Sequence, residues 1–200
     1  MGLQVAVGER VAGLERPAWD TAGLDPARAA ATAEYLGRWL PTPATLGRYK
    51  ALRWSRPGLV RLTSALVLRA RALARLGRLG EAVAALECAA EIPSGTEEFV
   101  ALERATLLLH ALHDPAAARE ALKPARLHAE RLPSEREGRP ERLLRLAAVE
   151  EALAAGDRAA AKRLADALAA DEAETPSTDE GDMGASFPAV VRAAQARAGS

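Results

Sequence analysis

The sequence predicts an all-α fold of stacked helix pairs, and two observations support this prediction. A helix-turn-helix pattern recurs from about residue 58 onward and is clearest over residues 74–86, where apolar positions repeat at helical spacing on both sides of Gly77. The composition agrees, because 49% of the residues are hydrophobic but only 4% are aromatic, so that small side chains let helices approach closely. Stacked helix pairs form a solenoid, and solenoids mostly bind other molecules.

The helix-pair pattern can be followed through three segments of the chain. In each segment the second helix carries a small or apolar anchor, followed four positions later by another apolar residue. The first anchors are Ala82, Ala118 and Ala161, and their separations of 36 and 43 residues compare with roughly 34 in the ideal repeat. The additional residues are expected in loops, mainly over residues 133–140.

Residues that cap helices support the same register. Asp114 stands before a proline, which is the arrangement of an N-cap acid followed by proline at the first helical position. Asp157 follows Gly156, and glycine can adopt the left-handed conformation that ends a helix. Asp25 also precedes a proline in similar surroundings, which suggests a fourth, degenerate pair near the N-terminus.

The chain as a whole is predicted to form about ten helices. They are expected over residues 3–15, 26–40, 43–54, 57–76, 79–91, 96–112, 115–131, 140–155, 158–170 and 188–200. We assign residues 1–57 to an aromatic-rich helical cap, of which a degenerate repeat is one interpretation, and residues 58–170 to three helix pairs. Residues 171–187 are assigned to an acidic mobile linker, and residues 188–200 to a short C-terminal helix.

The two ends of the chain differ in composition from its middle. All three tryptophans and both tyrosines precede residue 55. Tyr35 and Trp39 share a helix face and are expected to join Trp54 in a local core, with an exposed aromatic binding patch as the alternative. Residues 171–182 contain six acids and cannot form a core. The helix that follows is expected to cap the last pair; the alternative is that it folds back as an internal ligand, with the acids screening a basic groove.

Residues 58–170 resemble tetratricopeptide-type repeats. The sequence of residues 65–77 is similar to the degenerate repeats in regulatory regions of large bacterial transcription regulators. This resemblance implies a right-handed solenoid of helical hairpins and a role as a sensor or partner-docking platform.

By analogy with how such repeats stack, the first helix of each pair is expected to line a concave groove. The candidate partner-binding residues on this groove are Val67, Arg71, Arg75, Glu103, Leu107, His110, Leu146, Glu150 and Leu153. Arg71 and Arg75 share a face with Arg78, an arrangement that can hold a carboxylate tail or a phosphate. The alternative is that these arginines form only a solvated face.

Catalytic, metal and cofactor sites are not predicted. His110 and His113 have a spacing that suits two metal ligands, and Asp114 is adjacent, but no metal-binding motif accompanies them. Cys88 lies on an apolar helix and is expected to be a buried structural thiol, with a reactive thiol as the alternative. No nucleophile motif or phosphate-binding glycine loop is present, so we expect no enzyme.

Charge and hydropathy restrict the partners. The 27 basic and 27 acidic residues balance, whereas a general nucleic-acid binder usually has a basic excess. No segment resembles an export or membrane signal, so a cytoplasmic location is expected. The sequence therefore predicts a non-catalytic protein–protein interaction scaffold that binds a partner peptide or helix in its groove. The alternative is a ligand-sensing or regulatory module that acts with a transcription regulator. Self-association is left open.

Overall fold

The computed structural model describes residues 25–52, 54–131, 138–174 and 187–199, in which helices are joined by turns and loops and no strand occurs. Nine helices are described: α2 (Pro26–Gly37), α3 (Leu46–Lys50), α4 (Arg56–Arg75), α5 (Leu79–Ala90), α6 (Glu97–His110), α7 (Pro115–Arg131), α8 (Gly138–Ala154), α9 (Arg158–Glu174) and α10 (Phe187–Gly199). The all-α prediction is therefore confirmed. The tenth helix, expected over residues 3–15, lies outside the described residues.

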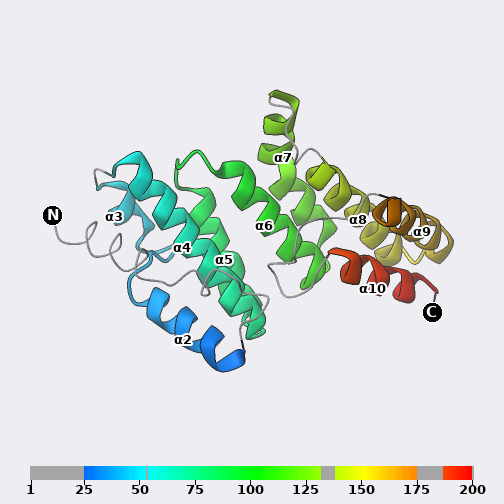
Figure 1. Cartoon of the computed structure of the whole chain (residues 1–200), viewed down its shortest axis with the longest axis horizontal. Helices are drawn as coiled ribbons and strands as arrows, with labels where there is room; N and C mark the ends of the chain where they lie inside the picture. The colour runs from blue at the N-terminus through cyan, green and yellow to red at the C-terminus, as the bar shows by residue number, and fades with distance from the viewer. Residues whose placement is uncertain (1–24, 53, 132–137, 175–186, 200) are drawn as a thin grey trace.

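The helices form an extended row in which α2 and α10 lie toward opposite ends (Figure 1). From α4 to α10, each helix packs on the next one along the chain. In addition, α4 packs on α6, α6 on α8, and α8 on α10, while α2 packs on α4. The main packing therefore joins helices that are neighbours or next neighbours in the sequence.

Three helical hairpins each turn at one residue in the left-handed conformation. The amide after it bonds the carbonyl five residues back in the first and third hairpins, and six residues back in the second, where the turn is one residue longer. The hairpins α4/α5, α6/α7 and α8/α9 turn at Gly77, His113 and Gly156, whose φ angles are 71°, 50° and 74°. The left-handed conformation ends the first helix of each hairpin, and the following amides satisfy carbonyls of its last turn. A glycine adopts this conformation without strain, whereas His113 does not. The second hairpin therefore accepts a strained histidine where the other two have glycine.

The second helices of the hairpins carry equivalent anchors, and two of them, α7 and α9, start with equivalent caps, whereas α5 follows Arg78 without a side-chain cap. Asp114 and Asp157 each accept a hydrogen bond at Oδ1 from the backbone amide three residues later, both at 2.9 Å. Asp25 caps α2 in the same way at 2.8 Å, which gives α2 the same start as α7 and α9. The anchors Ala82, Ala118 and Ala161 are each 0% exposed. The residues that the sequence pattern marks as anchors are therefore buried in all three hairpins.

These anchors make the packing sensitive to larger side chains. We expect Ala82→Leu and Ala118→Leu each to lower the free energy of unfolding by about 1–3 kcal/mol, because the added atoms have no space between the helices. Urea titration followed by circular dichroism measures this effect. Ala90→Leu is the matched control, since Ala90 is an exposed residue of α5. Equal stability of the anchor variants and the control would contradict the assigned packing.

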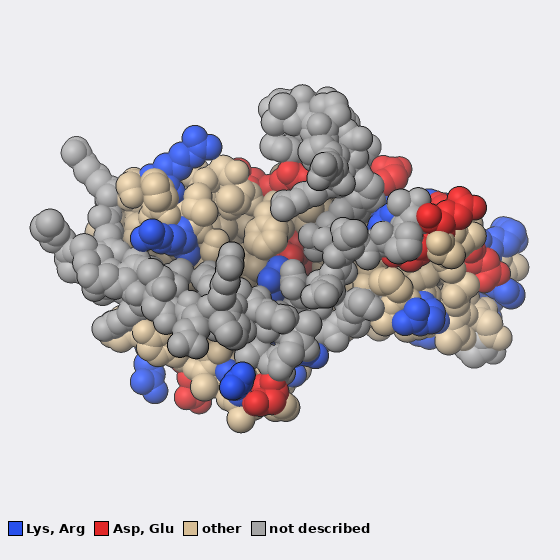
Figure 2. Space-filling model, in the orientation of Figure 1, with Lys and Arg blue, Asp and Glu red and all other residues tan. Residues whose placement is uncertain are grey.

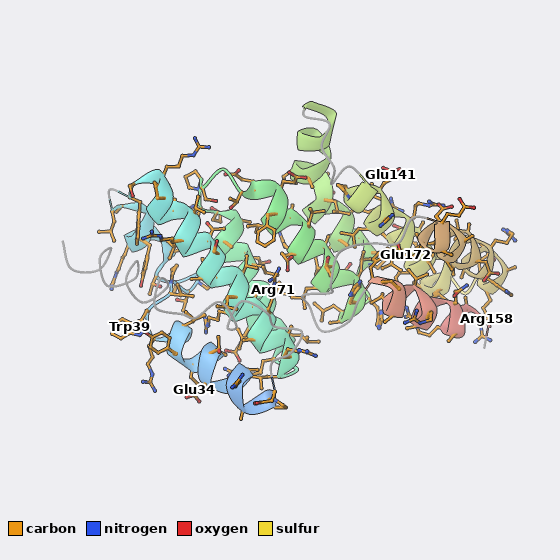
Figure 3. The ribbon with its side chains drawn as sticks, in the orientation of Figure 1. Glu34, Trp39, Arg71, Glu141, Arg158 and Glu172 are labelled. Atoms are coloured by element: carbon orange, nitrogen blue, oxygen red, sulfur yellow. The ribbon has the colours of Figure 1, made fainter. Side chains whose placement is uncertain are left out.

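The last hairpin extends further than predicted. Helix α9 continues to Glu174, four residues beyond the predicted end at residue 170. Asp171 pairs with Arg145, and Glu172, which is buried, pairs with Arg142 at 3.6 Å. The labelled Glu172 lies beside α8 in Figure 3. The first acids of the predicted linker are therefore part of a helix, because arginines of α8 neutralise them.

The aromatic residues near the N-terminus pack differently from the prediction. Tyr49 and Trp54 stack with ring centroids 6.5 Å apart and an interplanar angle of 9°. The Tyr49 hydroxyl donates to the Trp39 carbonyl, and Trp54 Nε1 donates to the Tyr49 carbonyl at 2.7 Å. Tyr35 is 38% exposed and does not join this group. A local core forms around Trp54, but Tyr49 is its partner; of the two residues predicted to join Trp54, Tyr35 is exposed and Trp39 contributes its backbone carbonyl to this group.

Candidate functional site

The predicted groove contains a buried ion pair between α4 and α6. Arg71 Nε donates to Glu103 Oε2 at 3.1 Å, and Arg71 Nη2 donates to Glu103 Oε1 at 2.9 Å. The Glu103 side chain is 0% exposed and that of Arg71 is 9% exposed. The guanidinium also lies 5.7 Å from the centre of the Phe99 ring. In Figure 3 the labelled Arg71 lies in the part of the row where α4, α5 and α6 run side by side. Arg71 therefore lies between helices, and the expectation that it faces solvent in a groove does not hold.

Most of the other predicted groove residues are also buried. Val67, Leu107 and Leu146 are at most 2% exposed and belong to the two apolar cores. Leu153 is half-buried and packs against the second core. The first helices of successive hairpins contact one another, α4 with α6 and α6 with α8. Side chains that point from one first helix toward the next are therefore covered. These four side chains contribute to stability in this structure.

Three predicted residues do come together at a pocket. Arg75, His110 and Glu150 lie on α4, α6 and α8, and the fourth wall is α10. We call this space of about 530 Å³ the terminal pocket, because it lies where α4 and α6 end. Its lining residues are Ala74, Arg75, Leu109, His110, Ala111, His113, Glu150, Ala189, Val190, Ala193 and Arg197. The sequence identified Arg75, His110 and Glu150, and for the C-terminal helix it left open whether it caps the last pair or folds back into the groove. In the structure α10 packs on α9 and α8 and also lines this pocket.

A buried carboxylate joins α8 to α10 at this pocket. The Glu150 side chain is 3% exposed. Arg197 of α10 donates to both of its carboxylate oxygens, with Nη1 3.1 Å from Oε2. His113 Nδ1 lies 3.4 Å from the same Oε2 and 3.3 Å from Arg197 Nη1. Glu150, Arg197 and His113 thus form one polar cluster among the residues that line the terminal pocket.

His113 places its side chain in this cluster at a conformational cost. A left-handed backbone costs an L-residue roughly 1–2 kcal/mol, which glycine avoids. Strained backbone that is retained often marks a functional position. The side chain of His113 is 51% exposed, so burial of its ring does not offset the strain. The sequence contained a signal for this site: a histidine at the turn position where the other hairpins have glycine.

A second pocket lies near the N-terminal end of the described chain. It has a volume of about 570 Å³ and is bordered by α3, the start of α4 and the end of α5. Its walls include the stacked Tyr49 and Trp54, and we call it the cap pocket. Lys50 donates to Glu91 at 2.5 Å at its edge, and this hydrogen bond lowers the pKa of the Glu91 carboxyl.

The thiol of Cys88 is buried, as predicted. Cys88 is 2% exposed and belongs to the first apolar core. Burial raises the pKa of the thiol above its ordinary value, and the nearby Glu87 raises it further. The neutral, weakly nucleophilic form is therefore favoured at neutral pH.

The raised thiol pKa has a consequence for stability. Because the folded pKa exceeds the unfolded one, this contribution is fully present below the unfolded pKa and is lost as the pH rises through the folded pKa. We expect the free energy of unfolding to fall as the pH rises above about 8.5, and Cys88→Ala to show a smaller fall. Urea titrations of both proteins at about pH 7.5 and about pH 9.5, on either side of that value, measure the difference. An equal fall in both proteins would contradict this origin.

The described residues contain no group of three or more His, Cys, Asp and Glu side chains that could hold a metal ion. None of the described helices combines the length and the apolar character needed to cross a bilayer. On the described part of the face in Figure 2, basic and acidic side chains lie interspersed and form no continuous patch of one sign.

The chain matches no protein-family model, no curated protein and no solved structure in the three comparisons. The assignment of a function therefore depends on the geometry of the pockets.

Proposed function

We propose that this chain is a non-catalytic interaction scaffold in which a peptide or helix of a partner protein docks at the terminal pocket. The helical hairpins would stack as a tetratricopeptide-like solenoid. Two features support this arrangement: the shared left-handed turn of the three hairpins, and packing that joins helices close in the sequence. Arg71, Val67, Leu107 and Leu146 then stabilise the stack, and the terminal pocket supplies the contact surface.

The observation that carries the proposal is the composition of this pocket. Four helices from distant parts of the sequence converge on it, and its lining combines charged groups with apolar side chains. The wall consists of small residues of α10 and the ends of α4 and α6. A partner side chain could insert against this wall while the charged groups orient it, as in the apolar centre and polar rim of protein interfaces.

A pair of variants on α10 tests the proposal. Ala193 is exposed and lines the terminal pocket, so Ala193→Trp is expected to fill the pocket with little change in stability. Ala196 is exposed on the same helix and does not line the pocket, so Ala196→Trp is the matched control. We expect partner capture from lysate of the source cells, quantified by mass spectrometry, to fall by about tenfold or more for Ala193→Trp only. Equal capture by both variants would reject the terminal pocket as the docking site.

The cap pocket favours a second candidate function, a ligand-sensing module that acts with a transcription regulator. Its walls combine two aromatic rings with apolar side chains, which is typical of small-molecule sites. A ligand that binds only the folded chain would raise its melting temperature. Small-molecule screening by thermal shift tests this candidate, and the second readout is the fluorescence of Trp54 in a variant whose other two tryptophans, Trp19 and Trp39, are replaced by phenylalanine. A ligand that raises the melting temperature without changing Trp54 fluorescence would not support the cap pocket.

A further inference from the structure

The polar side chains that line the cap pocket already have partners within the protein. The Tyr49 hydroxyl donates to the Trp39 carbonyl, and Trp54 Nε1 donates to the Tyr49 carbonyl at 2.7 Å. Lys50 donates to Glu91 at 2.5 Å, so that their charges balance. The other described residues of the lining are apolar: Leu46, Leu52, Leu59, Leu62, Ile92 and Pro93. The described lining therefore carries no net charge, and each of its polar side chains is engaged.

The two aromatic rings of the cap pocket are fixed in place by contacts on several sides. The indole of Trp54 is held through its Nε1 hydrogen bond, and its Cε3 atom lies 3.2 Å from the position that a Cβ atom on Gly58 would take. Gly58 thus leaves room for the ring against the start of α4. The Tyr49 ring stacks on the indole and is held at its hydroxyl. Because both rings are already ordered, a ligand that packs against them causes little further loss of side-chain entropy.

The pairing of Lys50 with Glu91 disfavours a charged ligand in the cap pocket. An ion that leaves water for an apolar lining needs a partner of opposite charge there. An anion could obtain Lys50 only by separating it from Glu91, and a cation could obtain Glu91 only in the same way. Lys50 lowers the pKa of the Glu91 carboxyl, which keeps this carboxylate ionised at neutral pH. A neutral molecule leaves the pair intact.

We propose that the cap pocket binds a neutral, mainly apolar small molecule, which lies against the rings of Tyr49 and Trp54. The volume of about 570 Å³ is within the range of small-molecule sites, and the burial of apolar surface drives binding. The proposal rests on the second candidate function, the ligand-sensing module, and names the class of ligand that this module takes. The bound molecule contacts α3, α4 and the end of α5 at once and so stabilises their arrangement.

Two fluorescent probes with the same ring system test the class of ligand. N-phenylnaphthylamine is neutral, and anilinonaphthalenesulfonate adds one sulfonate to it. Titration of the full chain, followed by the fluorescence of each probe, measures the two dissociation constants. We expect the neutral probe to bind about tenfold or more tightly than the sulfonate, because the sulfonate finds no unpaired cation in the described lining. Equal or tighter binding of the sulfonate, or no binding of the neutral probe, would overturn the proposal.

A matched pair of leucine variants locates the bound probe. Leu52 lines the cap pocket and is 36% exposed, whereas Leu164 of α9 does not line it and is 41% exposed. We expect Leu52→Asp to weaken binding of the neutral probe by about tenfold or more, because the new carboxylate loses water when an apolar molecule covers it. Leu164→Asp should leave the affinity intact, and thermal melting should show both variants folded. Equal affinities of the two variants would exclude the cap pocket as the site.

Glu91→Gln tests whether the ion pair sets the preference for a neutral molecule. The substitution removes the carboxylate that neutralises Lys50, so the ammonium group becomes available to an anion. We expect the sulfonate probe to bind about tenfold more tightly than it binds the unmodified chain, which corresponds to one charge-assisted hydrogen bond. An unchanged affinity for the sulfonate would refute the ion pair as the origin of the selectivity.

The same measurements distinguish failure of this proposal from failure of the sensing module. If a charged compound changes Trp54 fluorescence and its binding responds to Leu52→Asp, but the neutral probe does not bind, the ligand class is refuted and the module stands. If no compound, neutral or charged, does so, both are refuted. The scaffold function is unaffected by either result, since Ala193→Trp tests it at the terminal pocket.

Discussion

Glu103→Ala is expected to lower the free energy of unfolding by about 3–5 kcal/mol, because it leaves the charge of Arg71 buried without its carboxylate. The pair is bidentate, and its side chains are 9% and 0% exposed, so water cannot replace the lost partner without opening the contact between α4 and α6. The Phe99 ring, 5.7 Å from the guanidinium, offsets only part of this loss. Chemical denaturation followed by circular dichroism measures the difference.

Two controls identify burial as the cause of this loss. Arg119 and Glu151 form a bidentate pair between α7 and α8, but their side chains are 41% and 45% exposed. We therefore expect Glu151→Ala to cost at most about 1 kcal/mol. The double variant Arg71→Met/Glu103→Leu removes both buried charges and should recover most of the stability lost in Glu103→Ala. If Glu103→Ala and Glu151→Ala have equal effects, Arg71 and Glu103 are not buried as described.

Arg197→Ala is expected to lower the free energy of unfolding by about 1–2 kcal/mol and to loosen α10, because Glu150 loses the donor to both of its carboxylate oxygens. The effect should be smaller than that of Glu103→Ala, since the Arg197 side chain is 39% exposed and water can reach the vacated position. Hydrogen exchange of the α10 amides should accelerate while that of α4 and α5 stays unchanged.

Arg192→Ala provides the comparison for this variant. Arg192 is an exposed residue of the same helix, and its removal should alter neither stability nor exchange of α10. Slow exchange of α10 in Arg197→Ala would mean that the apolar contacts of Phe187, Val191 and Ala194 hold the helix without the ion pair.

The positions where the hairpins begin and turn could be predicted from the sequence, because the residues that set them lie close together in the chain. Asp114 and Asp157 cap helices that start immediately after them, and Gly156 ends the preceding helix by its own backbone conformation. The helix spacing that marks Ala82 as an anchor also lies within one hairpin. Such features depend on residues a few positions apart, and the structure places them as the spacing indicates.

The burial of the predicted groove residues could not be read from the sequence, because it depends on how the first helices of successive hairpins approach one another. Arg71 and Glu103 are 32 residues apart, and their identification as mutual partners requires the contact between α4 and α6. Once that contact exists, an arginine expected to face solvent becomes a buried ion-pair partner. Arg75 and His110 are only half-buried where they line the terminal pocket, whereas Glu150 is buried as well and pairs with Arg197 of α10.

The sequence by itself determined that this chain is all-α, where its hairpins turn, and that Cys88 is buried, because capping, helical periodicity and apolar surroundings act locally. Only the tertiary structure decided which charges are buried, that α9 includes Asp171 and Glu172, and that α10 forms a wall of the terminal pocket. The physical reason is that desolvation of a charge depends on every helix around it. The set of helices around a charge is fixed by packing between segments that lie tens of residues apart, and no local sequence pattern encodes this packing.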